Sequence, residues 1–113
     1  MNVQWVQKYC LSLPHVTEDI KWGNDLCFSI GKKMFCVVGL QEPNTASFKV
    51  SEEEFEEMAA RDGFKPAPYM AKYQWVYAID LGLMNRKEWE HYITQSYQLV
   101  KSKLAPKILI TLE

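Results

Sequence analysis

The side chains that could do chemistry in this sequence are few. Three cysteines, Cys10, Cys27 and Cys36, follow no CxxC spacing, and the two histidines, His15 and His91, are isolated. A zinc site needs three or four ligands at close spacing, so we expect no metal. The chain also lacks the GxGxxG and GxSxG motifs and a phosphate-binding P-loop. The sequence therefore predicts a non-enzymatic protein without a cofactor.

The densest group of carboxylates is a run of five glutamates, Glu52, Glu53, Glu54, Glu56 and Glu57. The run falls in the first turns of an expected helix, where negative charge favours the positive end of the helix dipole. We interpret these glutamates as a solvated helix face rather than a cation site.

Two of the cysteines flank a predicted hairpin. If Gly31-Lys32 is a two-residue type II′ turn, counting outward places Phe28 opposite Phe35 and Cys27 opposite Cys36. Cα atoms in a non-hydrogen-bonded pair are about 4.5 Å apart, just inside the range that a disulfide can bridge. We favour reduced, structural thiols, because buried free cysteines usually pack as small hydrophobes. A redox role for this pair is the alternative.

The same register assigns the two faces of the hairpin. The core side is expected to carry the apolar residues Leu26, Phe28, Ile30, Phe35 and Val37. The opposite side would then carry Cys27, Ser29, Met34, Cys36 and Val38.

Lysines mixed with aromatic residues form the best candidate binding surface. Residues 63–79 contain two lysines and no acid, and Lys49 is expected to point away from the core on its strand. Cations interleaved with aromatic rings suit phosphate contact and base stacking. We therefore predict a nucleic-acid- or partner-binding surface where four residues could converge: Lys49, Tyr69, Lys72 and Trp75. The alternative is that the aromatic rings are core residues and the lysines only solubilise the chain.

Three helices and five or six strands are expected to position these residues. With 113 residues, 48% of them hydrophobic, the chain suits one domain over 1–113. Helical spacing predicts helices over about 3–13, from Ser51 to Gly63, and from Asn85 to Ala105, with capping boxes at Ser51/Glu54 and Asn85/Glu88. Hairpins rather than βαβ units favour an α+β fold, a two-layer packing of these helices on an antiparallel sheet.

The net charge and the apolar pattern limit the classes of partner that the protein can bind. Lysine and arginine number 13 against 14 acidic residues, giving a net charge of -1. Dedicated nucleic-acid modules usually carry a basic excess, so any such binding must use a local patch. The sequence has no apolar run long enough to span a bilayer and no signal-peptide pattern. Together with the unpaired cysteines, this predicts a cytoplasmic protein without a membrane partner. The sequence leaves the oligomeric state open, and a monomer is favoured.

Several segments together resemble the MmcQ/YjbR family of small bacterial proteins. They are SLPHVTE at 12–18, KWG at 21–23, GKKMF at 31–35, SFKV at 47–50, PAPYM to WV at 66–76, and SYQLV at 96–100. The resemblance runs from about residue 3 to 104. It implies a YjbR-like α+β fold, which has been likened to the "double wing" DNA-binding motif of a phage transcription factor domain. The resemblance implies DNA as the partner, and the family has no catalytic residues to carry over.

Two functions follow as hypotheses. In the first, the protein is a DNA-binding module that uses Lys49, Lys72 and the loop at 65–75. In the second, it is an adaptor that binds a protein or a small ligand, with the aromatic loop as the contact surface. The salt dependence of binding separates the two, because phosphate contacts weaken as salt rises.

Overall fold

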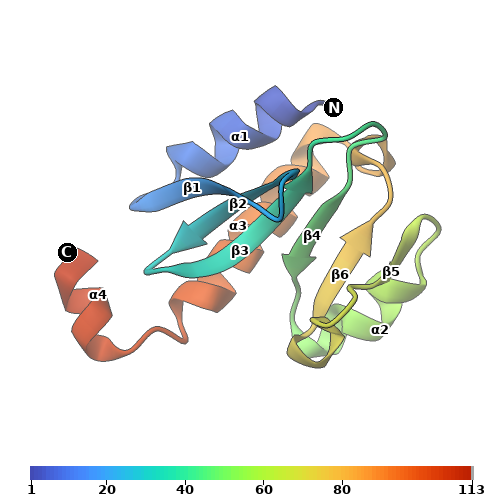
Figure 1. The fold of residues 1–113 in the computed structure, drawn as a ribbon. Helices are drawn as coiled ribbons and strands as arrows, with labels where there is room; N and C mark the ends of the chain where they lie inside the picture. Colours follow the sequence, from blue (N-terminus) through green and yellow to red (C-terminus); the bar gives the residue numbers. More distant parts are fainter. Residues whose placement is uncertain (113) are drawn as a thin grey trace.

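One antiparallel sheet of six strands organises the computed structural model, which describes residues 1–112 (Figure 1). The strand order is β1-β2-β3-β4-β6-β5. The strands are β1 Val16–Lys21, β2 Asp25–Ile30, β3 Lys33–Gly39, β4 Ala46–Lys49, β5 Phe64–Pro66 and β6 Trp75–Ala78. The helices are α1 Val3–Ser12, α2 Glu52–Ala60, α3 Arg86–Lys101 and α4 Pro106–Leu112, with short 3₁₀ turns η1 Ala71–Tyr73 and η2 Leu81–Leu83. The predicted α+β class is confirmed.

The helices cover one face of the sheet and leave the other open. Helix α3 packs against β2, β3 and β4, while α1 lies against β1 and α3, and α2 against β5 and β6. The core between these layers includes the fully buried Phe28, Phe48, Trp89 and Ile93. Figure 1 looks onto the other face, with α3 behind the sheet. The open face is the one available to a ligand.

Two of the helices begin at a side-chain cap, and one of the two predicted capping boxes forms. The Asn2 side chain accepts a hydrogen bond from Trp5 N at 2.9 Å, and Asn85 with Glu88 forms the expected capping box at α3. The capping box predicted at α2 is wrong. The Ser51 hydroxyl makes no bond to the helix backbone and instead lies 3.1 Å from Glu54 Oε1. Tertiary contacts of Glu54 with α3 have replaced the local cap.

The β2–β3 hairpin departs from the predicted register because β3 contains a bulge. Ile30 faces Lys33 as predicted, but Phe28 pairs with Cys36 rather than with Phe35. The extra residue, Phe35, has no partner on β2, so Phe35 and Cys36 both point into the core. Val38 is therefore inside and Val37 is on the open face, the reverse of the prediction.

The turn and the cysteine pairing are corrected as well. Gly31 and Lys32 both have positive φ, at 56° and 67°, which is the type I′ pattern rather than type II′. Cys27 pairs with Val37, so Cys27 and Cys36 project from opposite faces of the sheet and do not form the expected cross-strand pair. All three cysteines are free, and Cys10 and Cys36 belong to the core.

The number of strands agrees with the five or six expected, but the end of the chain differs. The third helix ends at Lys101, and a separate helix α4 follows it, so the described residues hold four helices and not three. Helix α4 packs beside the β2–β3 turn. A Cβ atom at Gly31 would lie 2.8 Å from Leu104 Cδ1, so glycine allows this close approach as well as the positive φ.

Glu54 joins α2 to α3, and we expect Glu54→Ala to lower the free energy of unfolding by about 1 kcal/mol at pH 7. The Glu54 carboxylate accepts hydrogen bonds from Gln95 Nε2 at 2.7 Å and from the Tyr92 hydroxyl at 3.3 Å. These bonds, chiefly that from Gln95, lower the pKa of Glu54. Its contribution is therefore full above the unfolded-state pKa and is lost as pH falls through the lower folded-state pKa.

Urea unfolding of wild type, Glu54→Ala and Glu57→Ala, at pH 7 and at pH 3, measures this effect. Glu57 is an exposed glutamate on the same helix and serves as the matched control. Equal losses in both variants, or a Glu54→Ala loss that does not shrink at pH 3, would contradict the assignment.

Candidate nucleic-acid interface

Two adjoining hollows form a groove that begins on the open face of the sheet and extends to Val100 at the end of α3. The first, the apolar hollow, has a volume of about 500 Å³, and the second, the lysine hollow, about 510 Å³. Met34, Met70 and Trp75 line both, so the two hollows lie side by side. We call the pair the groove.

The floor of the apolar hollow comes from the three central strands. Met34 and Val37 of β3 both face it, because the bulge at Phe35 lies between them. Ser47 of β4 and Trp75 and Tyr77 of β6 complete the floor. Trp75 is buried but lies outside the main core cluster.

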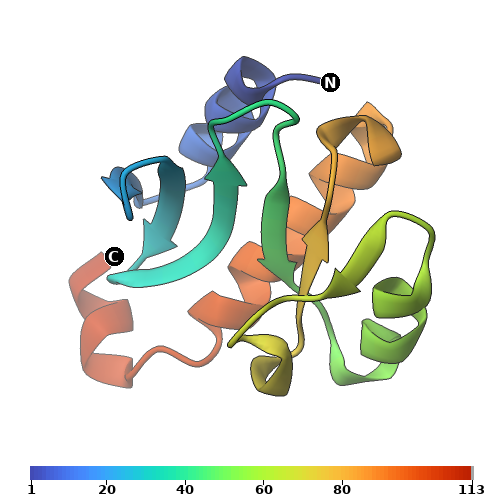
Figure 2. The same cartoon turned by 45° about the vertical axis from the view of Figure 1, so that its right-hand side comes forward.

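The walls of the apolar hollow come from segments near the two opposite edges of the sheet. Trp22 lies in the turn between β1 and β2, and Tyr69 lies in the loop between β5 and η1. In Figure 2 these two segments flank the central strands. Trp22 is 71% exposed and Tyr69 is 97% exposed. Two large aromatic side chains thus stand at the rims of an apolar floor.

The lysine hollow collects positive charge from four separate segments. Its lining includes five lysines and no carboxylate: Lys21, Lys32, Lys33, Lys49 and Lys103. Among residues 1–112, none of these lysines forms a salt bridge. Glu52, at the start of the acidic run on α2, lies near Lys49, but its carboxylate does not line the hollow.

Lys49 is buried, with 7% of its surface exposed, although it alternates with Phe48 and Val50 as predicted. Its ammonium donates a hydrogen bond to the Tyr73 carbonyl at 2.5 Å, which ties η1 to β4. Burial, followed by the nearby charge of Lys103, lowers the pKa of the Lys49 ammonium, and Glu52 partly opposes this. Lys49 and Lys103 therefore repel each other within the hollow.

The four residues predicted for the site are brought together in part. Lys49 and Trp75 are paired neighbours on β4 and β6, and Tyr69 and Trp75 share the apolar hollow. Lys72 is exposed beside them, with its ammonium 5.2 Å from the centre of the Tyr73 ring, and is not among the residues that line the groove.

Sequence reasoning missed Trp22 and most of the lysines, namely Lys21, Lys32, Lys33 and Lys103. The KWG and GKKMF segments carry three of these lysines and Trp22, and their clustering of cations and aromatic residues was the available signal.

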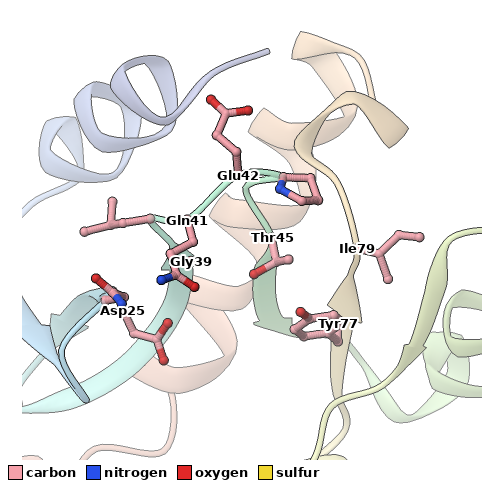
Figure 3. A pocket seen from close by; sticks show the side chains of 10 residues that line it. Asp25, Gly39, Gln41, Glu42, Thr45, Tyr77 and Ile79 are labelled. Atoms are coloured by element: carbon pink, nitrogen blue, oxygen red, sulfur yellow. The ribbon is translucent and has the colours of Figure 1, made fainter.

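A third hollow, of about 450 Å³, lies at the other end of the apolar hollow, with which it shares Asp25 and Tyr77 (Figure 3). Glu42 stands at its upper rim and points away from the neighbouring side chains. Asp25 and Glu42 thus stand at this end of the open face. Lys32 and Lys33 lie at the opposite end of β2 and β3, whereas Lys21 is paired with Asp25 across β1 and β2.

No group of three or more histidine, cysteine or acidic side chains in residues 1–112 is arranged to hold a metal ion. No helix in that part of the chain has the length and apolar character needed to cross a membrane.

Comparison with known proteins places the chain in a family and supports the fold. The YjbR family model matches residues 11–99. The crystal structure of a protein from Pseudomonas syringae superposes with a TM-score of 0.72 at 22% sequence identity, covering 88% of this chain and 98% of that one. No curated protein matches the chain.

Proposed function

The chain belongs to the YjbR family, and from the groove on its open sheet face we propose that the protein binds DNA. The observation that carries the proposal is the lysine hollow, where five lysines and no carboxylate surround a concave surface. Phosphate groups bound there would release counterions and relieve the repulsion between Lys49 and Lys103. The net charge of -1 is compatible with this, because no carboxylate lines the lysine hollow.

Lysine ammonium groups suit contact with the DNA backbone rather than reading of sequence. An ammonium is a compact point charge, and contacts to phosphate position a protein without specifying bases. Lys33 and Lys103 are exposed and border the lysine hollow from the β2–β3 hairpin and from the segment after α3. Lys72 adds positive charge next to Tyr73, which also lines that hollow.

The second candidate function is an adaptor that binds a protein or a small ligand through the aromatic loop at 65–75. The apolar hollow favours it, because Pro68, Tyr69 and Met70 offer a large and rigid contact area. An adaptor of this kind would bind with little dependence on salt, whereas DNA binding would weaken steeply.

We expect the Lys33→Gln/Lys103→Gln double variant to weaken DNA binding and to lower the salt slope. Each lost phosphate contact removes about 0.7 from the slope of log K against log salt for single strands and about 0.9 for duplexes. The double variant should therefore lose about 1.4 to 1.8 in slope. Fluorescence anisotropy with labelled DNA of mixed sequence, from low to physiological salt, measures this.

The matched control is Lys8→Gln/Lys87→Gln, which removes two exposed lysines from α1 and α3, on the helical side. This control should leave the slope close to that of the wild type. No binding by the wild type at low salt, or equal losses in both double variants, would contradict the proposed function.

A further inference from the structure

We propose that the groove takes single-stranded DNA, with one unstacked base in the apolar hollow between Trp22 and Tyr69 and the adjoining phosphates at the lysine hollow. This inference rests on the proposed function and adds the class of DNA. It follows from the position of the two hollows side by side, since a nucleotide has a flat base joined through its sugar to an anionic phosphate. The groove offers matching surfaces side by side.

The apolar hollow fits the face of a base better than the edge of a base pair. Its side chains are almost all aromatic, aliphatic or thioether groups, and only Asp25 and Ser47 bring a carboxylate or an aliphatic hydroxyl. Reading a duplex requires hydrogen bonds to base edges in a groove. The faces of the bases are hidden within the duplex stack and become available in single strands, where they stack on aromatic side chains.

The two wall residues are held in a backbone conformation that bulky side chains rarely adopt. The φ angles of Trp22 and Tyr69 are 53° and 65°, in the left-handed region. Both rings are largely exposed, so neither is packed in the hydrophobic core. Bulky residues kept in this region, at positions where glycine would fit more easily, are a feature of ligand-binding sites.

Charge at the far end of the open face limits how much of a strand the groove can follow. Asp25 and Glu42 line the third hollow, and their carboxylates would repel a phosphate placed there. Phosphates therefore belong at the lysine end, with the base directed toward the apolar hollow. We expect a site of a few nucleotides rather than a long track.

The test compares a labelled oligo(dT) strand of about 12 nucleotides, within the range of known single-strand sites, with a duplex of the same length. We expect the single strand to bind more tightly. Trp22→Ala and Tyr69→Ala should each weaken single-strand binding by about fivefold to a hundredfold, the usual cost of a lost base stack. Their salt slopes should stay unchanged, and duplex binding should not respond.

Conservative variants and folding controls make the result specific. Tyr69→Phe keeps the ring and should bind like the wild type, whereas Tyr69→Gly removes the ring and suits the positive φ. Thermal unfolding should show that Tyr69→Gly is at least as stable as Tyr69→Ala. If the Tyr69 ring were needed only for folding, the variants that bind DNA less tightly would also be less stable.

The outcomes also separate this inference from the proposed function. If the duplex binds at least as tightly as the strand, and the lysine variants still weaken it, the single-strand assignment is overturned while DNA binding stands. If neither DNA binds at low salt, the proposed function fails as well. Tighter binding of an acidic, aromatic peptide than of either DNA would overturn both in favour of the adaptor.

Discussion

Replacing Trp89 with alanine is expected to lower the free energy of unfolding by about 4 kcal/mol, because deleting a buried tryptophan leaves a large cavity. Trp89 is completely buried in the middle of the core. Its ring meets Phe48 of β4 edge to face, with centroids 5.7 Å apart, and its indole N–H donates to the Leu81 carbonyl at 2.8 Å. One side chain thus joins α3 to the sheet and to η2.

Two further variants separate the causes of this loss. Trp89→Phe keeps a ring but leaves the Leu81 carbonyl without its donor, so we expect a loss of about 2 kcal/mol. Trp22→Ala is the matched tryptophan control, and because Trp22 is mostly exposed we expect a change within about 0.5 kcal/mol. Chemical denaturation at pH 7 measures all three. A Trp22→Ala loss comparable to that of Trp89→Ala would contradict the placement of both residues.

Trp89 also illustrates what the sequence could predict. It lies in a long stripe at helical spacing that begins at a capping box, and both signals are local. Asn85 and Glu88 form that box, and Ile93, Tyr97 and Val100 of the same stripe are buried. Local patterns of this length are reliable because every turn of the helix repeats the same requirement.

The bulge in β3 shows where such reasoning fails. Phe35 and Cys36 are both apolar, so either could face the core, and hydrophobic pattern alone did not reveal that both do. A shift of one residue exchanges the faces of a strand. The predicted partners of Phe28 and Cys27 were therefore wrong, and Val37 was assigned to the core instead of the groove.

The candidate site was harder to predict than the fold because its residues come from distant segments. The strand before Trp22 carries mostly polar residues and lies at the edge of the sheet, so nothing local placed Trp22 opposite Tyr69. Lys49 was assigned to the correct face. Its burial depends on η1, whose Tyr73 carbonyl accepts its hydrogen bond. Contacts of this kind are set by tertiary packing rather than by local spacing.

Ser96 connects the fold to the groove, and we expect Ser96→Ala to lower the free energy of unfolding by about 2 to 6 kcal/mol. The β3–β4 ladder pairs Cys36 with Phe48, so its next pair would be Phe35 with Lys49. There the Ser96 hydroxyl of α3 takes the place of the direct bond. It accepts from Lys49 N at 2.9 Å and donates to the Phe35 carbonyl at 2.5 Å.

Alanine at this position would leave a buried N–H and a buried carbonyl without partners, and each such group costs about 1 to 3 kcal/mol. The control is Ser102→Ala, which removes an exposed hydroxyl that donates to the Leu99 carbonyl, and for which we expect a change within about 0.5 kcal/mol. Urea unfolding gives both values.

The same substitution tests whether Ser96 shapes the groove. Lys49 follows the end of the direct β3–β4 pairing, and its ammonium lines the lysine hollow, so a shift of its backbone would move that charge. Ser96→Ala should then weaken DNA binding and lower the free energy of unfolding together. Trp22→Ala should weaken DNA binding without lowering the free energy of unfolding. If Ser96→Ala has the same free energy of unfolding as the wild type, Lys49 N and the Phe35 carbonyl must bond directly to each other in the variant. The Ser96 hydroxyl would then not be what separates β3 from β4.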